Sequence, residues 1–539
     1  MKKFFVFVVM ALAYSVVYAQ GMYMLTEGWY GAYSGNVYMF SYGTNAFEEG
    51  TYKSVNDTQL GESGVNATQY GDRIYLVSKQ TGSYGGGILT VADAKTTQLI
   101  KSFTLSDLSD DGHNYDGRSF CGVSDEIGYL GTSNGIFVID LKNMQVVGLI
   151  NGTDSSYGVG ETIDGGWYAC DVYLHQIGAM VRVGDYVFAS QQNKGILVIN
   201  ANTHELEYTI KPEDVNPEFE TFGDIVIDNN GLLWTTPGKY ENWGWDHNPS
   251  LPYLICIDPY TWDNTLVIDI PDDIDPVKVS WSTYRAPMMQ ALKGSNRLVW
   301  RMSDDSDYNA GAPRICYYDI ELDEFGVLAD ITNEGYMSMY SSLSVDVEND
   351  IVWTVGSTST YGGDNALLGY KGTTGENVLN LPITQFSGYS DYMSTIFFTD
   401  DYEPEFKLDD EYVLQQNETK SLKLTDVISD KDNMDASIII EVEMIENETI
   451  ATATVLNGEL IFAMNGIGAT QVTLKANSNG KLVRKTISIV DDYTVAIENI
   501  KGENNAPIEY FNMQGVKVDN LECGVFIKRQ GSKISKVAF

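Results

Sequence analysis

The chain has 539 residues, which is too long for one ordinary hydrophobic core and predicts several domains or a repeat fold. Its 74 acidic residues far outnumber its 34 basic residues, and the formal net charge is −40. A charge of this sign repels nucleic acids and anionic membrane surfaces, so we expect neither as a partner.

Residues 1–19 carry the pattern of a secretory signal peptide. Lys2 and Lys3 precede an apolar stretch, and Val17-Tyr18-Ala19 is a small-residue cleavage site. We therefore expect the protein to be exported, to the cell surface or the outside, with the periplasm as the alternative. No Cys follows the cleavage site, so we expect no N-terminal lipid anchor, and no later stretch is apolar and long enough to span a bilayer.

From about residue 21 to residue 400 the chain repeats a unit of four short strands. Residues 123–150, VSDEIGYLGTSNGIFVIDLKNMQVVGLI, hold a complete copy. Four strands in about 30 residues form an antiparallel meander, which is the blade of a β-propeller. We predict seven blades within residues 20–403. The last run, residues 393–398, could close the ring by pairing with the strand that begins at Gly21.

The third strand of the unit recurs as GIFVID, GILVIN, YLICID and ICYYDI. These copies contain Asp140, Asn200, Asp258 and Asp319 at their ends. An Asp or Asn in that place can bond the backbone of its own turn, so we interpret all four as structural. Cys256 and Cys316 lie inside these apolar strands and are predicted to be buried thiols. A Cys121–Cys170 disulfide fits an oxidising compartment, but the sequence leaves it open.

The strand order sorts the loops onto two faces. Turns between the first and second strands and between the third and fourth strands are short, such as 124–128 and 141–144, and they define the turn face. Loops between the second and third strands and between blades are long, such as 106–119 and 151–176, and they define the loop face. Five of the nine Trp fall in these long loops. Aromatic side chains on long loops favour a binding surface over the channel mouth, although such loops can also form small cores of their own.

The candidate ligand-binding residues are therefore aromatic or Arg side chains of the loop face. Arg118 and Arg285 could anchor an amide, carboxylate or phosphate, or could instead pair with one of the many acids. The full set is Trp29, Tyr84, Arg118, Trp167, Tyr173, Trp243, Trp245, Trp281, Tyr284, Arg285, Tyr340 and Tyr361.

Signatures of catalysis are not found in the sequence. It has no nucleophile elbow, no H-E-x-x-H and no P-loop, so no catalytic residue is assigned. His113, His175 and His247 fall on the loop face, but their spacing is no metal-ligand motif, and no metal is expected there. A hydrolase or lyase that uses two of the abundant carboxylates stays open as an alternative.

After residue 403 the pattern changes. Residues 404–492 carry the strands of an immunoglobulin-like or cadherin-like β-sandwich. Its segment SDKDNMDA, residues 429–436, is either a solvated loop or a structural Ca²⁺ site with Asp430 and Asp432 as ligands. Residues 493–539 form a small β-rich tail with Lys and Arg near its end. The predicted fold class is thus all-β: a seven-bladed propeller, a sandwich and a small C-terminal β domain.

Three features of the sequence carry family resemblances. The repeated G-I-h-V-I-D strand, where h is apolar, resembles the YncE-like, YVTN-type seven-bladed propellers. The closing YMSTIFFTDDYEP resembles an exported Bacteroidetes group that includes surface proteins capturing vitamin B12 and related corrinoids for uptake. Residues 507–539, with Y-F-N-x-Q-G and G-V-F-I, resemble a Bacteroidetes C-terminal sorting-type domain, which implies a location at the cell surface or outside.

These observations favour a non-enzymatic binding protein. Its propeller would capture a medium-sized ligand, foremost a corrinoid, and an outer-membrane transporter is the partner that the resemblance implies. A glycan is the alternative ligand, because exposed Trp and Tyr stack well on sugars. A propeller enzyme and a protein-interaction scaffold remain further alternatives.

Overall fold

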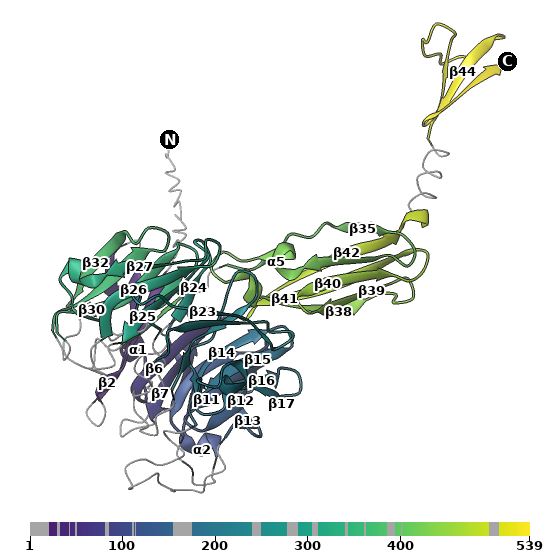
Figure 1. The fold of residues 1–539 in the computed structure, drawn as a ribbon. Coiled ribbons are helices and arrows are strands. Elements are labelled where there is room, and N and C mark those ends of the chain that lie inside the picture. The colour runs from purple at the N-terminus through teal and green to yellow at the C-terminus, as the bar shows by residue number, and fades with distance from the viewer. Residues whose placement is uncertain are drawn as a thin grey trace, which may run out of the picture.

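The computed structural model describes residues 21–29, 33–41, 44–48, 51–80, 86–109, 113, 115–154, 175–239, 250–277, 289–303, 311–339, 343–359, 363–384, 394–399, 402–494 and 506–539. Within them nearly all regular structure is β-strand, as the sequence predicts. Figure 1 shows three parts along the chain: a ring of small sheets, an elongated sandwich, and a small sheet at the C-terminus.

The ring consists of seven antiparallel blades, which confirms the predicted propeller. The first blade consists of β6 (Glu62–Tyr70), β7 (Arg73–Gln80), β8 (Leu89–Asp93) and β9 (Leu99–Phe103), and the second of β10 (Gly117–Gly122), β11 (Ile127–Thr132), β12 (Gly135–Asp140) and β13 (Gln145–Leu149). The third consists of β14 (Ile177–Val183), β15 (Tyr186–Gln191), β16 (Gly195–Asn200) and β17 (Leu206–Ile210), and the fourth of β19 (Val226–Ile227), β20 (Leu233–Thr235), β22 (Tyr253–Ile257) and β23 (Asn264–Asp269).

The other three blades complete the circle. They are β24 (Met289–Leu292), β25 (Arg297–Ser303), β26 (Gly311–Asp319) and β27 (Glu324–Asp330); β29 (Ser344–Asp346), β30 (Ile351–Ser357), β31 (Asn365–Lys371) and β32 (Asn377–Ile383), with β28 (Ser338–Met339) also paired to β30; and β33 (Ser394–Phe398), β1 (Gly21–Thr26), β4 (Val37–Ser41) and β5 (Ala46–Glu48).

Several short elements connect the blades. They are the strand pairs β2 (Gly28–Trp29) with β3 (Tyr33–Ser34) and β18 (Thr221–Phe222) with β21 (Pro237–Gly238), the helices α1 (Thr51–Val55), α2 (Leu105–Leu108) and α4 (Pro212–Val215), and the 3₁₀ turn η1 (Ile331–Glu334).

The last blade joins the two ends of the propeller sequence. β33 pairs antiparallel with β1, with Met22 opposite Phe398, and the Tyr23 and Phe397 rings stack with centroids 5.1 Å apart. The predicted closure is therefore confirmed. A closed ring leaves neither terminal strand with an unpaired edge, and the joined ends resist fraying.

Burial explains the repeated pattern. In β12 five of the six residues are buried, because neighbouring blades cover both faces of a third strand. The fourth strand β13 alternates between exposed and half-buried residues, because it lies at the rim. Cys256 and Cys316 are both buried, as predicted.

The polar residue at the end of the third strand has the predicted turn role. The Asp140 carboxylate accepts hydrogen bonds from the backbone N–H of Lys142 at 2.9 Å and of Asn143 at 2.8 Å. Equivalent bonds are made by Asn200, Asp258 and Asp319. These residues fix the tight turns between the third and fourth strands.

The sandwich follows the closing strand. One sheet holds β35 (Glu411–Leu414), β42 (Lys481–Asp491), β41 (Ala469–Ser478) and β38 (Ile439–Ile445), and the other holds β36 (Thr419–Lys423), β40 (Glu459–Met464) and β39 (Ala451–Leu456). The smaller elements are β34 (Glu405–Phe406), α5 (Leu424–Val427), β37 (Ile428–Ser429) and η2 (Asp435–Ser437). Alternating residues such as Leu460, Phe462 and Met464 bury one apolar core between the sheets.

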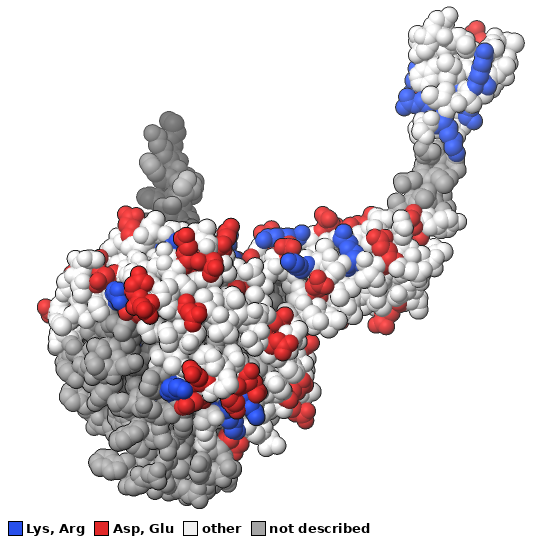
Figure 2. All heavy atoms as spheres, in the orientation of Figure 1, with Lys and Arg blue, Asp and Glu red and all other residues white. Residues whose placement is uncertain are grey.

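The C-terminal part is a three-stranded sheet of β43 (Ile508–Phe511), β44 (Val525–Gln530) and β45 (Lys533–Ala538). Figure 2 shows Lys and Arg gathered on this sheet, whereas Asp and Glu are scattered over the described surface of the propeller. None of the helices in the described part of the chain has the length and apolar character needed to cross a membrane.

Candidate functional site

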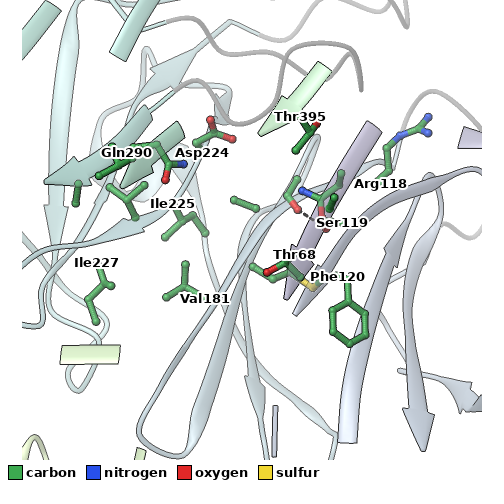
Figure 3. A pocket seen from close by; sticks show the side chains of 18 of the residues that line it. Thr68, Arg118, Ser119, Phe120, Val181, Asp224, Ile225, Ile227, Gln290 and Thr395 are labelled. Atoms are coloured by element: carbon green, nitrogen blue, oxygen red, sulfur yellow. Dashed lines mark hydrogen bonds between the residues drawn. The ribbon is translucent and has the colours of Figure 1, made fainter. Parts of the chain in front are cut away.

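A central channel runs between the innermost strands of the blades. Its cavity has a volume of about 370 Å³ and takes lining residues from β6, β10, β14, β19, β24, β29 and β33, which are the first strands of all seven blades. Because first strands run from the loop face to the turn face, the channel has one end at each face. Figure 3 shows that the two ends differ in chemistry.

The loop-face end of the channel is polar and the middle is apolar. Arg118, Asp224, Gln290 and Thr395 lie toward one end in Figure 3, and Val181 and Ile227 toward the other. The polar residues stand where the first strands begin, next to the loop face. Further along the same strands the alternation points Val and Ile side chains at the channel axis.

Arg118 is the predicted site residue that the structure places best. Its side chain lines the channel and is buried, with Nε donating to the Gln176 Oε1 at 2.8 Å and Nη1 donating to the Gly117 carbonyl at 3.0 Å. Its Nη2 lies 3.6 Å from the Asp116 Oδ2. Arg118 thus forms an ion pair and also borders the cavity, and its role as a ligand anchor stays a prediction.

A buried charge cluster extends from Arg118 toward the closing blade. Lys79 and Glu27, like Asp116, are buried. Burial lowers the pKa of Lys79, and the nearby Arg118 lowers it further, while Asp116 and Glu27 oppose the shift. Burial raises the pKa of Glu27 to about 8, because the attraction of Lys79 and a hydrogen bond from Ser63 only partly compensate for lost water.

Several unpartnered hydrogen-bonding atoms lie at the loop-face ends of the strands, and others, such as Trp262 Nε1, Glu348 Oε2 and Asn377 Nδ2, lie on the turn face. Within the described part of the chain, these side-chain atoms are buried and have no hydrogen-bond partner: Glu27 Oε2, Gln80 Oε1, Ser190 Oγ, Gln191 Nε2, Thr235 Oγ1 and both amide atoms of Asn365. Five of the seven blades contribute to this loop-face set. Leaving a buried polar atom unbonded costs about 1–3 kcal/mol, so such a concentration marks a place where an external partner would be favourable.

His175 lies at the same face, just before β14. Its Nδ1 lies 3.1 Å from the Asn193 Oδ1, and burial lowers its pKa to about 4. The imidazole of His175 is therefore neutral at physiological pH. Among the described residues, no group of three His, Cys, Asp or Glu side chains is arranged to hold a metal ion.

Most of the aromatic residues predicted for the site lie outside the described residues. These are Tyr84, Trp167, Tyr173, Trp243, Trp245, Trp281, Tyr284, Tyr340 and Tyr361, together with Arg285. Trp29 belongs to β2, but its side chain also lies outside what the structure describes. Their proposed role stays a prediction.

The turn-face end of the channel is covered by the sandwich. Met434, from the segment 429–436, is among the residues that line the cavity. The Asn477 amide donates to the Tyr70 hydroxyl at 3.0 Å, and the Gly71 N–H donates to the Asn479 carbonyl at 2.8 Å. A Cβ atom at Gly480 would lie 2.4 Å from the Gly71 nitrogen, so this close approach requires glycine.

The segment 429–436 binds the side-chain ammonium of Lys293, which belongs to the propeller. The Lys293 ammonium donates to the Asp435 Oδ1 at 2.7 Å, to the Asn433 carbonyl at 3.0 Å and to the Asp430 carbonyl at 2.5 Å. The predicted Ca²⁺ ligands Asp430 and Asp432 lie in this segment, and Ca²⁺ binding there stays a prediction. Lys293 could not be predicted as the partner of this segment, because it is about 140 residues away along the chain.

Cys121 lies at the boundary between the two domains. It is a free thiol that borders a smaller cavity of about 230 Å³ together with Arg182 and Asn477. Burial raises the pKa of its thiol to about 12, so the thiol is protonated and unreactive. Cys170, with which the sequence left a disulfide open, lies outside the described residues.

A family model described as "Domain of unknown function (DUF5074)" matches residues 20–399. The chain belongs to this family. The matched range contains all seven blades and ends at the closing strand, so the family corresponds to the propeller. Among curated proteins, no sequence matches the chain.

Solved structures show likenesses at low identity. One is a quinonprotein alcohol dehydrogenase-like protein from Bacteroides thetaiotaomicron, 12% identical, with a TM-score of 0.47 over 71% of this chain and 78% of that one. Another is a candidate 6-phosphogluconolactonase from Bacteroides uniformis, 11% identical, with a TM-score of 0.45 over 71% of this chain and 100% of that one. No activity is transferred from either structure.

Proposed function

We propose that the protein is an exported, non-enzymatic binding protein that takes its ligand at the loop-face end of the propeller channel. The observation that carries this proposal is the contrast between the two channel ends. The sandwich covers the turn-face end, whereas on the loop face buried polar atoms at the ends of second and third strands, around the channel rather than in its wall, lack partners within the described residues. A ligand at the loop face would satisfy these atoms and recover part of their desolvation cost.

The chemistry of the loop-face set indicates a ligand rich in neutral polar groups. Gln80 Oε1 needs a donor and Gln191 Nε2 needs an acceptor, whereas Glu27 Oε2 can donate when the carboxyl is protonated and accept when it is not. Carboxamide groups supply both, and so do sugar hydroxyls. Arg118 pairs with Asp116, and burial shifts the pKa values of the nearby Lys79 and Glu27 toward their neutral forms. This cluster therefore favours a neutral ligand over a strongly ionic one.

A corrinoid is the ligand that we propose first. The chain resembles a group that includes corrinoid-capturing surface proteins, and a corrin ring carries carboxamides around its edge. A macrocycle of this width does not fit inside a cavity of about 370 Å³. It would lie across the mouth, with its amides directed at the loop-face set and the aromatic residues of the long loops against its faces. Uptake would then need a transporter in the outer membrane.

Isothermal titration of the purified chain with cobinamide and with cobalamin tests the proposal. We expect binding to both, and we expect Glu27→Met or Gln191→Leu to weaken it roughly tenfold each, because each removes one buried hydrogen bond. Glu126→Met is the matched control, since Glu126 lies in a turn-face turn and is exposed. Absence of heat with both ligands contradicts the corrinoid assignment, and binding on a glycan array would then favour the glycan alternative.

A further inference from the structure

The sandwich does more than cover the turn face, because it supplies a wall of the channel. Met434 lines the same cavity as residues from all seven blades, and it packs with the apolar cluster that contains Ile225 and Ile227. The rest of the cavity wall comes from residues 20–399, so this one side chain comes from another domain. The cavity is therefore built jointly by two domains.

Several contacts hold Met434 in this position. The Lys293 ammonium bonds to residues on both sides of Met434, at the Asn433 carbonyl and the Asp435 carboxylate. The Asp430 N–H donates to the same Asp435 carboxylate at 2.9 Å, which closes the segment on itself. Lys475 of the sandwich adds an ion pair with Asp125 of a turn-face turn at 3.4 Å. Charge-assisted hydrogen bonds on both sides of Met434 hold its side chain at the sandwich end of the cavity, which we call the floor. A floor fixed in this way can limit how far a ligand enters.

The wall of the cavity, between its loop-face mouth and Met434, favours a narrow apolar ligand. It is formed by small or branched apolar side chains, namely Ala67, Ile177, Val181, Ile225, Val345 and Val347. The cavity volume corresponds to about twelve water molecules at roughly 30 Å³ each, which also suits a chain of about ten heavy atoms. Near it, Asn66 Oδ1 is buried and unpartnered within the described residues and could accept a hydrogen bond from a hydroxyl or amide N–H.

We propose that the channel is a pocket for a slender, mainly aliphatic ligand or ligand arm with a neutral hydrogen-bond donor, and that Met434, at its sandwich end, sets its depth. The ligand enters from the loop face, since the sandwich stands at the other end. The inference goes beyond the proposed function in one respect: it assigns the channel interior, whereas the corrinoid would lie across the mouth.

Calorimetric titration with 1-alkanols from butanol to decanol tests this pocket in the full chain. Each added methylene buried against Val and Ile should tighten binding roughly three- to fourfold. The gain should stop at the chain length at which the alcohol reaches Met434. A series that rises without a plateau, or that shows no saturable binding, overturns the proposal.

Substitutions at the floor give the sharper result. Met434→Ala removes three heavy atoms, so the plateau should move to alcohols two or three carbons longer, while Met434→Phe should keep it in place or shorten it. Met444→Ala is the matched control, because Met444 lies on the same sandwich and is 51% exposed. A plateau that Met434→Ala leaves at the same chain length as Met444→Ala overturns the role of Met434.

The two proposals fail separately. If alcohols bind in a way that depends on Met434 while neither cobinamide nor cobalamin binds, the pocket is supported and the corrinoid proposal is contradicted. Corrinoid binding that depends on Glu27, with no saturable alcohol binding, would do the reverse. Competition between decanol and a bound corrinoid would show that a ligand arm enters the channel.

Discussion

The two faces of the propeller carry the same number of strand ends, but the polar side chains on them have different partners. On the turn face, Tyr70, Arg182 and Lys293 each interact with a residue of the sandwich. On the loop face, Glu27 and Gln191 keep buried atoms that have no partner within the described residues. The turn face contacts the sandwich, and the loop face is where we propose that a ligand binds.

The difference follows from where the chain leaves the ring. The closing strand β33 runs toward the turn face, so the segment after Thr399 emerges there and the sandwich packs next to its exit. A closed ring alone would offer two similar ends. The added domain covers one end, so our proposal places the ligand at the loop face. The fold itself assigns no activity, because propellers host many.

The largest expected effect concerns the pH dependence of Glu27 on the loop face. In the unfolded chain its pKa is near the ordinary value of 4.5, and in the folded protein burial raises it to about 8. Between these values the folded state holds the extra proton, so this contribution to stability is complete below about pH 4.5 and is lost as the pH rises through 8. We expect a loss of about 2–4 kcal/mol between pH 5 and pH 8.

Urea unfolding of the protein and of Glu27→Gln at both pH values measures this contribution. The amide does not titrate, so the variant should lose less stability than the parent over the same interval. The difference between the two chains isolates Glu27 from the general repulsion of a protein with a charge of −40. Parallel pH profiles for both chains would show that Glu27 does not hold an extra proton.

The second effect concerns Lys293 on the turn face. Lys293→Met leaves three oxygens of the segment 429–436 without their cation, at a site where both charged side chains are about one-fifth exposed. We expect docking of the sandwich to weaken by about 2–3 kcal/mol. All nine Trp belong to the propeller, so their fluorescence follows the unfolding of that domain, while calorimetry follows both.

In the parent chain we expect the two domains to unfold together, and in Lys293→Met we expect calorimetry to resolve a separate, earlier transition without tryptophan signal. Lys142→Met is the control, because the Lys142–Glu126 pair is exposed and worth at most about 1 kcal/mol. Identical thermograms for the two variants would mean that the Lys293 contacts do not hold the sandwich.

The sequence predicted what depends on local pattern. The alternation of apolar residues, the polar ends of the third strands and the spare strand at 394–398 each follow from neighbours in the chain, and all three are confirmed. The strand order also placed Arg118 at the loop face. Its exact partners could not be predicted, because Gln176 is 58 residues away.

Contacts between distant segments were beyond sequence reasoning. The acidic segment 429–436 suggested a bound cation, and the described structure places the Lys293 ammonium there, which no spacing rule connects to it. Met434 gave no signal as a channel residue, because its apolar side chain fits the sandwich pattern equally well. Glu27 is one of 74 acids, and only burial distinguishes it.

The smallest effect tests whether turn-face turns act locally. The Asn200 Oδ1 accepts from the N–H of Asn202 at 2.9 Å and of Thr203 at 3.1 Å, so Asn200→Ala should cost about 1 kcal/mol in urea unfolding. Asn200→Asp should recover most of this loss, because the Asp140 carboxylate accepts the equivalent turn hydrogen bond in the preceding blade. A small remainder is expected, because a new carboxylate would stand near Glu207.

Corrinoid and alcohol affinities should stay unchanged in both variants, since the turn lies at the face away from the channel mouth. A change in either affinity would show that the two faces are coupled, and that the separation between a structural face and a binding face is incomplete.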